Sequence, residues 1–147
     1  NPRLFNEIAK ILPDNNLAWI GDGELRGELT AKNISILGWK NREEALEELN
    51  KYDVFILTSL WEGLPMTLIE AGCLGKLCVV SNVIGNRDVI KNEENGYIFD
   101  NIIQVKEIIE NINERNYKKI TQQFRKEIKK EYNTDVMVEK YKEQYRS

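Results

Sequence analysis

The chain has 147 residues, a length that suits one domain with a substantial hydrophobic core. Hydrophobic residues make up 41% and charged residues 31%, and no apolar stretch approaches the roughly 20 residues of a membrane-spanning helix. The absence of histidine excludes Ser-His-Asp and Cys-His catalysis, and the formal net charge of −3 gives no support to a nucleic-acid partner.

Helical and strand-like patterns alternate along the chain as far as Asp100. The expected helices are Phe5–Leu12, Glu24–Ala31, Arg42–Tyr52, Met66–Leu74 and Asn86–Ile90. The expected strands are Leu17–Ile20, Ile34–Leu37, Val54–Leu57, Leu77–Val80 and Gly96–Phe99. This alternation predicts an α/β fold, a Rossmann-like parallel sheet with flanking helices. We expect Val54–Leu57 to be its central buried strand and Gly96–Phe99 a short edge strand.

Beyond Asp100 the apolar residues repeat at helical spacing, through Ile102–Ile112 and then Tyr117–Tyr132. Either Asn133 or Thr134 is expected to cap a last helix. We therefore predict a single domain over residues 1–147, with an α/β core at 1–101 and a helical tail at 102–147.

Residues 115–130 hold seven basic residues and one acid, Glu127. A solvated helix face is the preferred interpretation, and a basic amphipathic helix in contact with an anionic membrane is the alternative. Aromatic residues lie on the apolar stripe of this segment and not among its basic residues, which argues against nucleic-acid binding. We expect a cytoplasmic protein, with the inner face of the membrane as a second location.

Several side chains are expected to be buried. Cys73 and Cys78 form C-x4-C, which fits neither a zinc site nor a redox motif, so we expect two small core residues and no metal. Cys73 is placed on the buried side of a helix and Cys78 in a core strand. Leu25 and Leu29 are expected to face inward, and Trp19 to lie in the core.

Glycines follow each of the first two strands. Gly21 and Gly23 permit either a plain tight turn or a close approach of backbone to a ligand, and both interpretations stay open. Arg26 stands where the third glycine of a dinucleotide-binding turn would be, and no acid ends the next strand. Trp39, after Gly38, is expected either to pack on a nucleotide base or to cover the sheet edge as a partly buried side chain.

Two glutamates, Glu62 and Glu70, bracket the loop and helix that follow the strand Val54–Leu57. Ligands of open α/β sheets bind at the carboxyl ends of the strands. Carboxylates there can accept hydrogen bonds from sugar or ribose hydroxyls, and the helix start between them offers free N–H groups to a phosphate. A solvated loop carboxylate and a glutamate that favours the helix dipole are the alternative, which we regard as the weaker one.

The same segment resembles a known family signature. Glu62-x7-Glu70, with Gly63-Leu64-Pro65 and Ala71-Gly72 in or beside it, is similar to the motif of retaining GT-B glycosyltransferases of family 4. The likeness extends in order over most of the chain and includes the segments Trp19–Leu25, Ile36–Trp39 and Asn95–Phe99. It implies the C-terminal, donor-binding domain of such an enzyme, which moves a sugar from a nucleotide diphosphate with retention at the anomeric carbon.

The resemblance also implies roles for individual residues. Glu62, the catalytic candidate, would contact hydroxyls of the donor sugar, and Glu70 would hold the ribose hydroxyls. The diphosphate would face backbone N–H groups between them and the Thr67 hydroxyl. The candidate donor-binding residues are Gly21, Gly23, Trp39, Gly63, Leu64, Pro65, Met66, Thr67, Leu68 and Glu70. No metal or other cofactor is implied; the favoured donor is a UDP-sugar, and the expected acceptor is a glycan or a lipid-linked molecule of polysaccharide biosynthesis.

In the resembled family a strand in the middle of the sheet and an Arg- or Lys-bearing loop come before the helix expected at Phe5–Leu12. The chain opens at Asn1 without a Met, so we expect a longer protein whose preceding part supplies that strand, a basic phosphate clamp and the acceptor domain. The alternative is that a second copy of the chain fills the position of the missing strand. We expect the chain alone to bind a nucleotide without turnover. The alternatives are a Rossmann-type dinucleotide-binding domain and a degenerate, non-catalytic α/β interaction domain.

Overall fold

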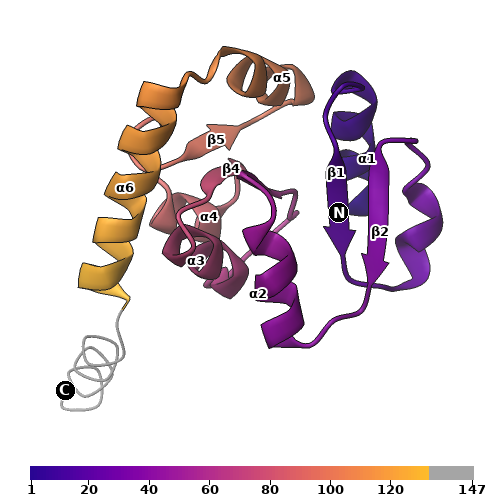
Figure 1. The fold of residues 1–147 in the computed structure, drawn as a ribbon, viewed down its shortest axis with the longest axis horizontal. Helices are drawn as coiled ribbons and strands as arrows, with labels where there is room; N and C mark the ends of the chain where they lie inside the picture. Colours follow the sequence, from indigo (N-terminus) through magenta and orange to yellow (C-terminus); the bar gives the residue numbers. More distant parts are fainter. Residues whose placement is uncertain (133–147) are drawn as a thin grey trace.

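The computed structural model describes residues 1–132 and shows an α/β fold whose strands all pair in parallel (Figure 1). Its α-helices are α1 (Pro2–Ile11), α2 (Arg42–Asn50), α3 (Met66–Cys73), α4 (Ile84–Val89), α5 (Ile102–Asn111) and α6 (Glu114–Glu131), and a 3₁₀ helix, η1, covers Glu24–Glu28. Its strands are β1 (Leu17–Ile20), β2 (Ile34–Gly38), β3 (Val54–Leu57), β4 (Leu77–Ser81) and β5 (Tyr97–Phe99). The predicted fold class and strand order along the chain are confirmed.

Strand β4 forms the centre of the hydrophobic core. All five of its residues are buried, and successive side chains point to opposite faces of the sheet. Cys78 and Val80 pack with α3, α4 and α6, whereas Leu77 and Val79 pack with α1, α5 and the first half of α6. Burial on both faces is the usual environment of a strand inside a parallel sheet.

The described strands form two hydrogen-bonded ladders, β1–β2 and β3–β4–β5. Within residues 1–132 no backbone pairing joins β1 to β3, so these two strands present open edges. Ile56 of β3 nevertheless packs against the side-chain cluster that includes Phe5 and Leu17. We call this junction the β1–β3 seam. The seam separates the two ladders, and the resemblance predicts a further strand in the middle of the sheet.

Strand β3 was expected to be the central buried strand, and this prediction is wrong. It lies at the edge of its ladder and is only half-buried, while β4 is the fully buried strand. An apolar run shows that a strand will be covered by side chains, but it does not show how many strands will pair with it. The predicted edge position of Gly96–Phe99 is confirmed by β5.

Two predicted burial patterns are also wrong. The segment Glu24–Ala31 forms only the short 3₁₀ helix η1, in which Leu25 is 49% exposed. Leu29, just after that helix, is buried as predicted. Glycines at positions 23 and 27 weaken helical propensity, so the segment makes a single tight turn. Cys73 is exposed because it is the last residue of α3, outside that helix's buried face. Cys78 is buried as predicted, and Trp19 is partly buried with its ring edge-on to Phe5 at 5.2 Å.

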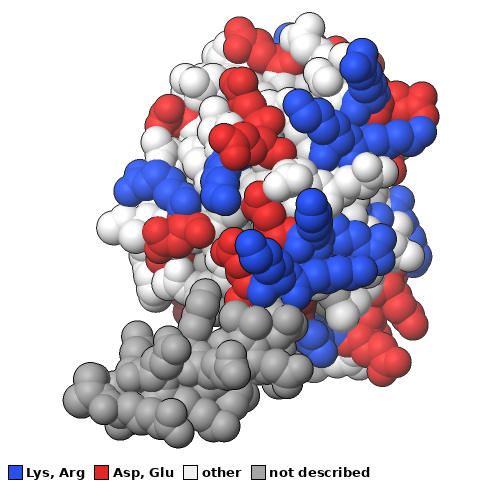
Figure 2. Space-filling model, turned by 90° about the vertical axis from the view of Figure 1, so that its left-hand side faces the viewer, with Lys and Arg blue, Asp and Glu red and all other residues white. Residues whose placement is uncertain are grey.

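The tail begins with α5 and α6, close to their predicted bounds. Asn101 and Asn113 cap these two helices, and α6 buries Ile120, Phe124 and Ile128 against the core. The basic side chains of α6 are therefore on its outer side, and Figure 2 shows Lys and Arg gathered on this face among acidic residues. The predicted last helix, from Asn133 or Thr134, lies outside the described residues. None of the helices in residues 1–132 combines the length and apolar character that crossing a bilayer requires.

Candidate functional site

The carboxyl ends of β1, β2 and β3 lead into the loops that carry the candidate residues. The carboxyl ends of parallel strands in one sheet lie at the same edge. Gly21 follows β1, and its N–H donates to the carbonyl of Gly38 at 2.8 Å. Gly21, Gly23 and Gly38 have φ values of 128°, 152° and 71°, a region that favours glycine. These glycines build a tight double turn at the end of the first ladder.

Trp39 projects from that double turn. Its side chain is 76% exposed, so the alternative in which it covers the sheet edge as a partly buried residue is wrong. The indole leaves a large flat apolar surface in solvent at this edge of the molecule. Asp22 has local partners, because it accepts a hydrogen bond from the Gly23 N–H at 2.9 Å and pairs with Arg26 at 3.1 Å.

The candidate residues between β3 and the first turns of α3 are of two kinds, some buried in the core and some exposed to solvent. Pro65 is buried at the N-cap of α3, and its carbonyl accepts hydrogen bonds from the N–H groups of Leu68 and Ile69. Leu68 is fully buried, so its side chain belongs to the core. Met66 and Thr67 are exposed at the first turn, where helix N–H groups have no acceptor within the helix. Exposed Gly63 and Leu64 lie just before this turn.

Glu62 is half-buried in the same loop and is held by a neighbour. The Ser59 hydroxyl donates to Glu62 Oε1 at 2.5 Å. The start of α1 lies nearby, because the Thr58 hydroxyl donates to the Asn1 carbonyl at 3.0 Å. The Ser59 contact thus holds the Glu62 carboxylate in one orientation.

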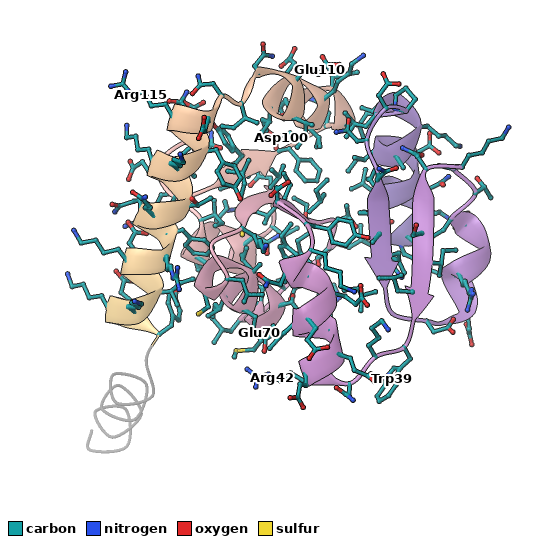
Figure 3. All side chains as sticks on the ribbon, viewed as in Figure 1. Trp39, Arg42, Glu70, Asp100, Glu110 and Arg115 are labelled. Carbon is teal, nitrogen blue, oxygen red and sulfur yellow. The ribbon has the colours of Figure 1, made fainter. Side chains whose placement is uncertain are left out.

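Glu70 lies on α3, and its side chain is only 20% exposed. Its Oε1 atom is 2.6 Å from Nε of Arg42, the first residue of α2. Figure 3 shows Glu70, Arg42 and Trp39 at one edge of the molecule. Sequence reasoning missed Arg42, although a cation at a helix N-terminus is electrostatically unfavourable and could have signalled a specific partner.

The described residues contain no group of three or more His, Cys, Asp or Glu side chains that could hold a metal ion. The edge therefore offers two oriented carboxylates, free helix N–H groups and an exposed indole. This set can accept hydrogen bonds from hydroxyls, donate them to an anion and pack against a flat ring. These are complementary to the parts of a nucleotide linked to a sugar.

Comparison with known proteins identifies the family. The sequence profile of the glycosyl transferases group 1 family matches residues 3–137. The chain belongs to this family. This membership confirms the resemblance stated from the glutamate motif.

Among curated proteins, the chain is 38% identical over 115 residues to the Escherichia coli UDP-Gal:alpha-D-GlcNAc-diphosphoundecaprenol alpha-1,3-galactosyltransferase. That match covers 68% of this chain and 29% of the relative, so the chain spans about a third of the length of that enzyme.

Solved structures show the same fold. The structure of HepE from Anabaena in complex with UDP-glucose matches 97% of this chain and 44% of its own, with a TM-score of 0.82 and 17% identity. The C-terminal domain of the group 1 family protein LpcC from Francisella tularensis matches 90% of this chain and 79% of its own, with a TM-score of 0.72 and 18% identity. The fold is therefore that of the C-terminal domain of a GT-B glycosyltransferase.

Proposed function

We propose that this chain is the donor-binding half of a retaining glycosyltransferase that uses a UDP-sugar. The observation that carries the proposal is the pair of oriented carboxylates, Glu62 and Glu70, on either side of the exposed first turn of α3. Membership of the glycosyl transferases group 1 family supports it. So do the names of the Escherichia coli relative and of the HepE complex, both of which contain a UDP-sugar.

In this proposal each part of the site takes one part of the donor. Glu70 accepts hydrogen bonds from the ribose hydroxyls, and Trp39 with the Gly21–Gly23 turn borders the base. The N–H groups of Met66 and Thr67 bind the diphosphate, where the positive end of the α3 dipole stabilises the charge that develops on the leaving group. No metal or other cofactor takes part in this scheme.

Glu62 binds the sugar. Its carboxylate accepts hydrogen bonds from sugar hydroxyls, which fixes the ring for transfer to the acceptor with retention at the anomeric carbon. The acceptor is a glycan or a lipid-linked molecule, bound by a further domain of the longer protein. The basic outer face of α6 would attract the enzyme to an anionic membrane surface on its cytoplasmic side. We expect the chain alone to bind the donor and to show no turnover.

A dinucleotide-binding domain is the second candidate. It is disfavoured because Arg26 replaces the third glycine of the expected turn and pairs with Asp22 at 3.1 Å. A degenerate domain without ligand would also have this fold. Binding of a nucleotide therefore decides among the candidates.

The test is titration of the chain with UDP, GDP, ADP and NAD, followed by NMR chemical-shift perturbation. We expect selective binding of UDP, with a Glu70→Gln variant at least about tenfold weaker because a neutral amide oxygen replaces the charged acceptor of the ribose hydroxyls. Glu48→Gln is the matched control, since Glu48 is 22% exposed and also pairs with a cation, Lys51, at 2.9 Å. Binding of NAD alone, or equal weakening by both variants, would contradict the proposal.

A further inference from the structure

The loop that carries Glu62 is held by a chain of hydrogen bonds from two other elements. Ser59 donates its hydroxyl to Glu62 Oε1 at 2.5 Å, and the Ser59 carbonyl accepts the Ser81 hydroxyl at 2.7 Å. Asn86 of α4 in turn donates Nδ2 to the carbonyl of Ser81 at 2.9 Å and lies 3.4 Å from its hydroxyl oxygen. We call Ser59, Ser81 and Asn86 the serine–asparagine relay. It connects α4 to the Glu62 carboxylate through the carboxyl ends of β3 and β4.

The inner members of the relay are shielded from water. Ser81 is 7% exposed and Asn86 is fully buried. Hydrogen bonds in such a low-dielectric environment are strong and directional, so the relay restricts the positions that the loop can adopt. Asn86 Oδ1 has no hydrogen-bond partner among the described residues.

Glycine at position 85 brings α4 into contact with the same loop. A Cβ atom at Gly85 would lie 2.6 Å from the Glu62 carbonyl oxygen and still closer to that of Gly63. Any larger residue would push the loop away from α4. The backbone of the loop is thus held at Glu62 and Gly63 by contact with Gly85, and at Ser59 by the relay.

The last hydrogen bond of this chain is the one from the Ser59 hydroxyl to the Glu62 carboxylate. Ser59 occupies Oε1, and no donor within residues 1–132 is bonded to Oε2. The hydroxyl of Ser59 therefore selects one orientation of the carboxylate and leaves Oε2 for a ligand hydroxyl. This division matches the need of a sugar-binding carboxylate, whose geometry must be set before the ligand arrives.

We propose that Ser59 is a positioning residue for Glu62, with Ser81 and Asn86 fixing the backbone of Ser59. The inference rests on the proposed function, in which Glu62 binds the sugar of the donor. Ser59 acts through Glu62 and makes no contact with the nucleotide. Its removal therefore reduces the affinity that the sugar adds, and leaves the affinity for UDP itself unchanged.

The test is calorimetric titration of the protein with UDP and with UDP-galactose, UDP-glucose and UDP-N-acetylglucosamine, which finds the sugar that adds affinity. The variants are S59A, S59T, E62A and, as a matched control serine on β2, S35A. We expect S59A and E62A each to weaken binding of the preferred UDP-sugar by about tenfold, with UDP affinity within about twofold of the parent protein. S59T keeps the hydroxyl and should retain most of the sugar's contribution, and S35A should change neither affinity.

The outcomes separate the inference from the function on which it rests. If E62A lowers the sugar's contribution and S59A does not, the positioning role of Ser59 is wrong and the donor site stands. If E62A leaves the sugar's contribution unchanged, the proposed role of Glu62 is wrong. Equal weakening of UDP and UDP-sugar by S59A would mean general damage to the loop and would overturn the positioning role. Thermal melting of each variant verifies that it is folded.

Discussion

Glycine at position 72 allows α3 to pack more closely against α6 than a residue with a side chain would. A Cβ atom at this position would lie 2.6 Å from Cδ1 of Phe124 and closer still to Cε1 of Phe124 and Cδ1 of Ile128. Phe124 and Ile128 are 1% and 4% exposed, so neither can move into solvent to make room. The substitution Gly72→Ala therefore overpacks the core between the two helices.

The size of this effect follows from two opposing contributions. Overpacking a core typically costs about 1–3 kcal/mol, and we take the upper part of that range because two buried side chains must shift. Replacing glycine by alanine inside a helix gains about 1 kcal/mol. We thus expect Gly72→Ala to lower the free energy of unfolding by about 1–2 kcal/mol, and the melting temperature by roughly 3–6 °C for a chain of this length.

Thermal melting of four proteins tests this reasoning: the parent, Gly72→Ala, Phe124→Leu and the double variant. A smaller side chain at position 124 makes room for the new methyl group, so the double variant should be more stable than additivity predicts by about 1 kcal/mol. Gly27→Ala is the control, because it is exposed and a Cβ atom there meets nothing within 4 Å. A higher melting temperature for Gly72→Ala, or strict additivity in the double variant, would refute the argument.

Three further predictions concern other parts of the molecule. Arg42→Ala should tighten UDP binding by about two- to fivefold at low salt, and by less at high salt. The reason is that the ion pair between Arg42 and Glu70, worth up to about 1 kcal/mol, no longer competes with the ribose for the Glu70 carboxylate. Weaker binding of UDP, measured by calorimetry, would contradict this. Ellman's reagent should titrate one thiol quickly, that of exposed Cys73, because Cys78 is buried and burial raises its pKa; two fast thiols would be inconsistent with the structure. Asn33→Ala should lower the free energy of unfolding by about 1–3 kcal/mol, since its amide donates to three backbone carbonyls at and after the end of α1; an unchanged melting temperature would argue against this role.

The sequence predicted the order and the parallel arrangement of the elements well, because these depend on local patterns. Apolar runs such as Leu77–Val80 and the helical spacing of Tyr117–Tyr132 each follow from a few neighbouring residues. The segment that became η1 was the exception, since the spacing of Leu25 and Leu29 suggested a helix that the surrounding glycines did not support. Short segments with glycine are where periodicity carries the least information.

The candidate site was predicted in outline and incompletely in its contacts. Glu62 and Glu70 were found because a short motif carries them. Arg42, which pairs with Glu70, and Ser81, which holds Ser59, are 28 and 22 residues away along the chain from their partners. Such contacts depend on which loops meet at the sheet edge, and this is decided by strand pairing that one sequence does not show.

The β1–β3 seam has a consequence for how the molecule opens. The double turn with Trp39 belongs to one ladder and the two glutamates follow the other, and no backbone hydrogen bond within residues 1–132 connects the two. Segments that share few hydrogen bonds can unfold locally as separate cooperative units. Amide exchange should therefore show one protection level for β1 and β2 and another for β3 to β5. A ligand that touches Trp39 and Glu70 together would join the two units, so its binding would be visible as slower exchange on both sides of the seam.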